Sequence, residues 1–91
     1  MHSIITNDTD CFICGKRAIE KHHIFGGANR NNSTKYGLTV PLCNECHRGT
    51  KGVHNNRHLD LWLKRIAQQS FQYVNRKTKE DFRKIFSKNY L

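Results

Sequence analysis

The chain has 91 residues, with 16 Lys and Arg against 7 Asp and Glu, and a formal net charge of +9 at pH 7. A chain of this length forms one domain and buries only about 60% of the surface exposed by its unfolded form, so its core is thin. Such small domains usually need a metal, disulfides or oligomerisation. No apolar stretch is long enough for a membrane span. The N-terminal stretch contains Asp8 and Asp10 and no apolar segment typical of a secretory signal, so we expect a cytoplasmic protein.

The first part of the chain is rich in loops. Short strands are predicted over residues 17–24 and 36–40, and the second should stop at Pro41, which cannot donate a hydrogen bond to a sheet. The Gly- and Asn-rich segment 26–33 between them is predicted to be a long, turn-prone connection. A short helix is expected over residues 44–48.

The last part of the chain, residues 57–91, contains no Cys, Gly or Pro and is predicted to be helical. Apolar residues recur there every three or four positions, which is the period of one buried helix face. They are Leu59, Trp62, Leu63, Ile66, Ala67, Phe71 and Val74. We expect helices near 57–74 and 78–87, the second beginning with a capping arrangement at Thr78. Trp62 is expected to pack in the core.

The four cysteines form two C-x2-C pairs, Cys11 with Cys14 and Cys43 with Cys46. Each pair lets two thiolates face one ion, and two pairs complete the tetrahedron that zinc prefers. The alternatives are a redox C-x-x-C pair or two disulfides. A redox role would leave the second pair unexplained, and a reducing cytosol disfavours disulfides. We therefore predict a structural Zn²⁺ whose binding adds to the folding free energy.

Four of the six histidines are candidates for a second site: His22, His23, His47 and His54. If the two cysteine pairs share one zinc, residues 15–42 form a closed loop that brings His22 and His23 near His47. Neighbouring residues of a regular strand point to opposite faces. Both can therefore serve one site only if the strand ends or bends there. The remaining two, His2 and His58, are expected to be ordinary surface or core residues.

These motifs together resemble the HNH (ββα-metal) endonucleases, in particular the small zinc-containing HNH proteins of phages and prophages. The similar segments are the first C-x2-C pair, EKHHI at 20–24, LTVPLCNECH at 38–47 and GVH at 52–54. The resemblance implies a small α+β fold, in which a zinc-stabilised ββα-metal core over residues 1–56 is followed by two C-terminal helices over 57–91. Residues 1–91 would form a single HNH-type domain.

The resemblance also implies a role for each histidine. His22 and His47, with His54 in the phage-type variant, would bind a catalytic divalent ion, Mg²⁺ or Mn²⁺ or another divalent metal. His23 would be the general base in hydrolysis of a DNA phosphodiester bond. The family usually has an Asn before the second strand, where Gly37 stands here. A backbone carbonyl, Tyr36, or Asn29 or Asn32 would have to replace it.

The charge of +9 fits a nucleic-acid partner, because cationic side chains displace the counterions of DNA. Arg17, Arg30 and Arg48 are candidates for DNA binding. A second copy of the chain, or a phage packaging or recombination protein, is the expected further partner, because a small chain has a small DNA footprint. The alternative function is a non-catalytic, zinc-stabilised module that binds DNA or a partner, with a decayed HNH site. The missing Asn favours this module, whereas the adjacent histidines favour the enzyme.

Overall fold

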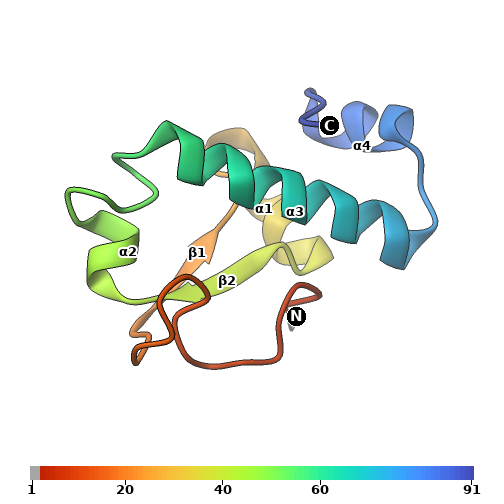
Figure 1. Ribbon diagram of the computed structural model, residues 1–91. Coiled ribbons are helices and arrows are strands. Elements are labelled where there is room, and N and C mark those ends of the chain that lie inside the picture. The colour runs from red at the N-terminus through yellow and green to blue at the C-terminus, as the bar shows by residue number, and fades with distance from the viewer. Residues whose placement is uncertain (1–2) are drawn as a thin grey trace.

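The computed structural model describes residues 3–91, so His2 lies outside the described residues. The elements, in chain order, are β1 (Glu20–His23), the 3-10 helix η1 (Gly27–Asn29), α1 (Arg30–Tyr36), β2 (Thr39–Leu42), α2 (Asn44–Arg48), α3 (Arg57–Asn75) and α4 (Lys79–Phe86). Residues 3–91 form a small α+β fold with one two-stranded antiparallel sheet and four α-helices. In Figure 1, α3 extends across the molecule from the end near α2 to the side where α4 lies. No helix within residues 3–91 is long and apolar enough to cross a bilayer.

The second strand continues through Pro41, so the prediction that it stops there is wrong. Pro41 lies opposite Lys21 in the antiparallel pair. Hydrogen-bonded pairs alternate along such a ladder, and the N–H of Ile24 donates to the carbonyl of Leu38 at 3.1 Å. The Lys21–Pro41 pair therefore falls at a position that needs no N–H donor. The Pro41 carbonyl accepts instead the N–H of Phe12 at 2.9 Å, which links the first cysteine pair to the sheet.

The segment between the strands is helical, so the prediction of a loop over 26–33 is also wrong. It forms η1 and α1, and α1 ends at Gly37, whose φ of 70° favours glycine. The fully buried Ser33 holds this segment against the end of β1. Its hydroxyl donates to the Phe25 carbonyl at 2.7 Å and accepts the Phe25 N–H at 3.0 Å. The backbone two residues after His23 is thereby held in place.

The three predicted helices are confirmed as α2, α3 and α4. The expected cap of the last one is also present. The hydroxyl of Thr78 accepts the N–H of Asp81 at 3.2 Å, and the Asp81 carboxylate accepts the N–H of Thr78 at 3.0 Å. These two bonds satisfy N–H groups at a helix start that otherwise lack partners.

The core lies where α3 and α4 pack against the residues that follow β1. Phe25, Phe71, Phe82 and Phe86 are buried there, and the rings of Phe82 and Phe86 stack with centroids 4.5 Å apart. Trp62 packs against Phe12 with ring centroids 6.1 Å apart, but 47% of it is exposed, so it lies at the edge of the core rather than inside it. The aromatic cluster holds the chain just beyond His23.

Candidate metal centres

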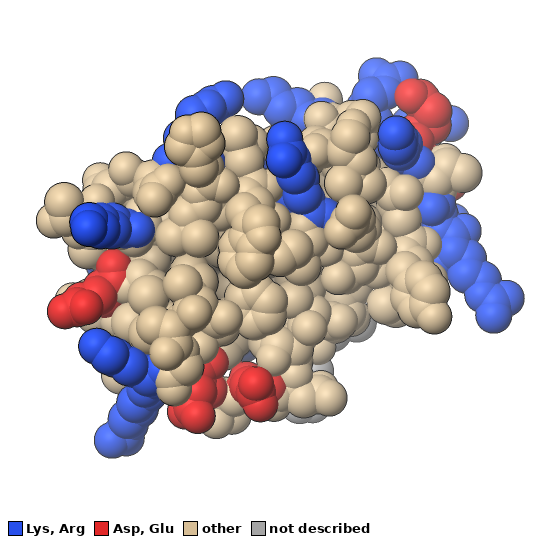
Figure 2. Space-filling model, viewed as in Figure 1, with Lys and Arg blue, Asp and Glu red and all other residues tan. Residues whose placement is uncertain are grey.

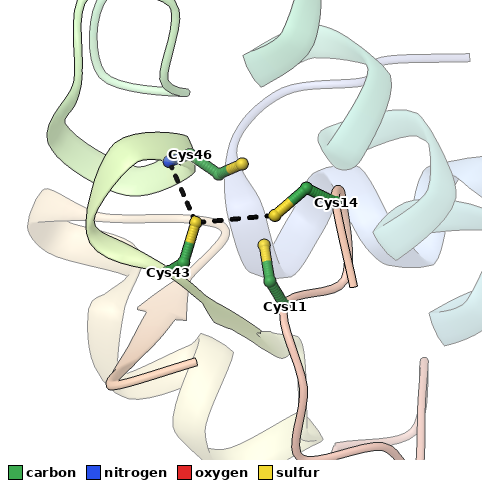
Figure 3. A group of neighbouring side chains, drawn as sticks. All are labelled: Cys11, Cys14, Cys43 and Cys46. Atoms are coloured by element: carbon green, nitrogen blue, oxygen red, sulfur yellow. Dashed lines mark hydrogen bonds between the residues drawn. The ribbon is translucent and has the colours of Figure 1, made fainter. Parts of the chain in front are cut away.

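The four cysteines come together in one cluster, with their sulfurs all within 4.8 Å of one another. Figure 3 shows the sulfurs pointing toward a common centre, two from the loop before β1 and two from the start of α2. The Sγ atoms of Cys14 and Cys43 are 3.6 Å apart, and all four residues are free thiols. Tetrahedral Zn–S bonds of about 2.3 Å would place sulfurs about 3.8 Å apart. The cluster therefore has the geometry to bind a metal such as zinc.

Backbone turns set this geometry. Gly15 has a φ of +78° and donates its N–H to the Cys11 carbonyl at 2.9 Å, which closes the first turn. The second pair lies at the start of α2, where the Cys43 sulfur accepts the Cys46 N–H at 3.5 Å. A sulfur at a helix N-terminus receives N–H groups that lack intrahelical partners.

The thiols differ in their tendency to ionise. Burial opposes ionisation of the Cys11 thiol, but backbone N–H groups, that of Cys14 first, outweigh it and lower the pKa of Cys11 to about 6. Burial and the neighbouring thiols, that of Cys43 first, raise the pKa of Cys46. Several thiolates so close together repel one another, and a bound cation removes that penalty. The donor set thus fits a divalent metal.

Three histidines form a second cluster, in which one ligand nitrogen from each of His22, His47 and His54 lies within 4.8 Å of the others. They come from β1, α2 and the loop after α2, and their ring centroids are 4.7 to 5.4 Å apart. His22 and His47 are buried and His54 is exposed. Three protein ligands with one open side are typical of catalytic metal sites.

Burial, followed by the charges of His47 and His54, lowers the pKa of His22 to about 4. Burial also lowers the pKa of His54. In the described residues, Nε2 of His22 is buried without a hydrogen-bond partner. A neutral imidazole with a free buried nitrogen is suited to bind a metal ion.

The loop after α2 places His54 beside His47. The N–H of Val53 donates to the Cys46 carbonyl at 2.8 Å, so the chain folds back along the helix. This return requires Gly52, because a Cβ there would lie 2.7 Å from the Glu45 carbonyl oxygen and 2.8 Å from that of Cys46. The first position of the GVH motif is therefore a glycine because any side chain there would clash with the backbone of α2.

We expect Gly52→Ala to destabilise the domain by roughly 1–3 kcal/mol, the usual cost of forcing extra atoms into a packed region. It should also weaken metal binding at the histidine cluster. The measurement is the free energy of unfolding from a denaturant titration. Gly26→Ala is the matched control, because a Cβ at Gly26 meets nothing within 4 Å. Equal unfolding midpoints for the two variants would contradict this view of the loop.

His23 is not part of the ligand cluster but lies beside it. It is the last residue of β1, so the strand ends at the point where it must end or bend if His22 and His23 are to serve one site. Its side chain lines two cavities of about 510 Å³ and 290 Å³, and His22 and His54 line both of them as well. The pKa of His23 is lowered, first by burial and then by the positive charges of Arg30 and Lys21. A neutral imidazole on this wall can accept a proton near neutral pH.

The larger cavity has a mostly basic wall. Its charged lining residues are Glu20, Lys21, Arg30 and Arg48. Two of the predicted DNA-binding arginines, Arg30 and Arg48, are therefore at the site. Arg17 is not among the lining residues, and its backbone pairs with that of Asp10 in an isolated β-bridge. Glu20 and Lys21 also line this cavity, although no sequence motif pointed to their side chains. On the face in Figure 2, Lys and Arg lie mostly around the edge and partly in the upper middle, and Asp and Glu form only small groups.

The residues predicted to replace the Asn of the HNH motif have other roles. The Asn29 side chain donates to the Phe86 carbonyl at 2.9 Å, and that of Asn32 to the Ile85 carbonyl at 3.4 Å, both at the end of α4. Tyr36 packs its ring on Phe71. Within residues 3–91, the buried Nδ1 of His23 has no hydrogen-bond partner. The loop after β1 is held instead by the Ser33 hydroxyl.

Comparisons of the chain with protein-family models, with curated proteins and with solved structures gave no match. Function is therefore inferred from the geometry of the two clusters and of the cavity beside them.

Proposed function

We propose that the chain is a metal-dependent endonuclease or nickase of the HNH type that hydrolyses DNA phosphodiester bonds. The observation that carries the proposal is the histidine arrangement. Three imidazoles, from His22, His47 and His54, meet at a basic cavity, and His23 lines the wall of that cavity. A module that only binds DNA needs basic side chains but no cluster of imidazoles.

In this mechanism His22, His47 and His54 would hold a divalent ion, Mg²⁺ or Mn²⁺ by family resemblance. The ion would supply Lewis-acid stabilisation of charge on the scissile phosphate and the leaving oxygen. Imidazole ligands also accept Ni²⁺ and Zn²⁺, whereas Mg²⁺ prefers oxygen ligands. His23 accepts a proton from the attacking water, for which its lowered pKa keeps it neutral.

The basic residues of the cavity would bind the DNA backbone. Lys21, Arg30 and Arg48 come from β1, α1 and α2, so their charges converge on the larger cavity from three elements. The side chain of Arg48 is 63% exposed, which leaves part of its guanidinium free for a phosphate. The net charge of +9 adds affinity that does not depend on sequence.

A second candidate is a non-catalytic zinc module that binds DNA or a partner protein. The observation that favours it is the environment of His23, whose Nδ1 has no bracing partner among the described residues. In this case the cysteine cluster would stabilise the domain, and the histidines would be remnants of an active site.

Nicking of supercoiled plasmid DNA by the purified, zinc-loaded protein tests the proposal. We expect nicking with Mg²⁺ or Mn²⁺, and none after EDTA treatment, because the cleavage step needs the ion held by the histidines. His47→Ala, purified in parallel, controls for contaminating nucleases and should lose the activity. DNA binding without nicking under every divalent metal would exclude the enzyme and favour the zinc module.

A further inference from the structure

One carboxylate stands between the histidine cluster and the basic wall of the cavity. In Glu20, at the start of β1, Oε1 lies 3.2 Å from Nδ1 of His47 and Oε2 lies 3.1 Å from Nε of Arg48. Among residues 3–91, Glu20 is the only acidic residue that lines the larger cavity. It therefore contacts a candidate metal ligand with one oxygen and a candidate phosphate-binding residue with the other.

The fold produces this bridge from residues that are distant in sequence. Glu20 pairs with Leu42, the last residue of β2, and α2 begins two residues later at Asn44. The single helical turn that follows therefore packs back over the start of β1. His47 and Arg48, both in the last turn of α2, then face the same carboxylate.

The contacts have chemical consequences. A histidine that binds a metal usually donates its second N–H to a carboxylate or carbonyl, which fixes its tautomer and its orientation. With Nδ1 of His47 at Glu20, Nε2 is left for the ion. Nδ1 of His47 lies within ion-pair distance of the Glu20 carboxylate, at 3.2 Å, but the two atoms form no hydrogen bond in this structure.

We propose that Glu20 is a positioning residue that couples the metal cluster to the phosphate-binding wall. One oxygen orients His47 so that Nε2 faces His22 and His54. The other holds Arg48 by Nε, which keeps its terminal guanidinium nitrogens free at the cavity. This inference rests on the proposed function in requiring that the histidine cluster binds a divalent ion.

The first test measures metal binding without DNA. Zinc-loaded wild type, Glu20→Ala and Glu20→Gln are titrated with Co²⁺, and affinity is taken from calorimetry and from the visible absorption bands of the bound ion. We expect Glu20→Ala to weaken Co²⁺ binding roughly 10–100-fold. Glu20→Gln should retain most of the affinity, because its amide oxygen can still lie against Nδ1 of His47 and keep the ring in place. Glu45→Gln, an exposed acid on α2, is the matched control and should match the wild type.

The second test separates the two roles of the carboxylate in the nicking reaction. A glutamine whose amide oxygen faces His47 turns its NH₂ group toward Arg48, which is itself a donor, so the contact that holds Arg48 is lost. We therefore expect Glu20→Gln and Arg48→Ala to raise KM for DNA with little change in kcat, whereas Glu20→Ala should also lower kcat. If Glu20 only stabilised the fold, its variants would have a smaller folded fraction but would not differ in their effects on KM and kcat.

The outcomes distinguish this inference from the proposed function. Wild-type Co²⁺ affinity and absorption bands in a folded Glu20→Ala would overturn the positioning role even if the protein is a nuclease. If Glu20→Ala weakens Co²⁺ binding as expected but the wild-type protein nicks no DNA, the positioning role is supported and the proposed nuclease function is overturned. A zinc-loaded wild type that binds no second ion would overturn both. Circular dichroism of each variant establishes that it is folded.

Discussion

Replacement of His23 by alanine is expected to reduce DNA nicking roughly 10²–10⁴-fold, the usual contribution of general acid–base catalysis. The protein should keep its fold and its metal ions. His23 stands outside the cluster of His22, His47 and His54, so its removal takes away no ligand. It is also only partly buried, so truncation leaves no closed cavity in the core. The loss should therefore appear in kcat, measured as the initial nicking rate at saturating metal.

His58→Ala is the matched control for this variant. His58 is exposed near the start of α3 and belongs to neither metal cluster, so its replacement should leave the rate unchanged. Equal rates for His23→Ala and the wild type would exclude His23 as the general base. If His23→Ala instead lost the second ion, as judged by metal analysis, His23 would be a ligand and the base would have to be sought elsewhere.

The helices were predictable from sequence where their stabilisation is local. α3 and α4 have apolar residues at helical spacing, and Thr78 begins α4 with a cap that is visible in the sequence. α1 has no such pattern. Its seven residues, RNNSTKY, include one buried side chain, the polar Ser33. This helix depends on tertiary bonds from Ser33 to Phe25 and from Asn32 to α4, which no local pattern predicts.

The same distinction applies to the site. Cysteine and histidine are uncommon residue types with few roles, so their spacing predicted that the four cysteines meet and that His22 lies near His47, whereas His54 was predicted only from the resemblance. Glu20 and Lys21 are common surface residue types, and nothing in their local sequence distinguishes them. Their place at the cavity depends on the register of β1 against β2 and on the way α2 packs back over β1. Arg17 looked equivalent to Arg30 and Arg48 in sequence, but the fold keeps it away from the cavity wall.

The double substitution Cys11→Ser and Cys14→Ser is expected to remove the metal from the cysteine cluster and to unfold the domain. Structural zinc in small domains contributes an apparent binding free energy of about 10–16 kcal/mol at pH 7. Whole domains have a net stability of about 5–15 kcal/mol. Here Cys11 and Cys43 are themselves buried in the core, and the backbone of Phe12 bonds to Pro41 of the sheet. Loss of the ion should therefore separate the N-terminal segment from β2 and expose the edge of the core at Trp62.

The measurement is zinc content by elemental analysis together with far-ultraviolet circular dichroism and amide hydrogen exchange. His47→Ala is the control, because it removes a ligand from the histidine cluster and leaves all four cysteines in place. It should keep one zinc and the folded spectrum.

For the wild type stripped by a strong chelator, we expect refolding on addition of Zn²⁺ but not of Mg²⁺, since thiolates select the softer ion. A double variant that stays folded without zinc would mean that the aromatic core alone stabilises this 91-residue chain.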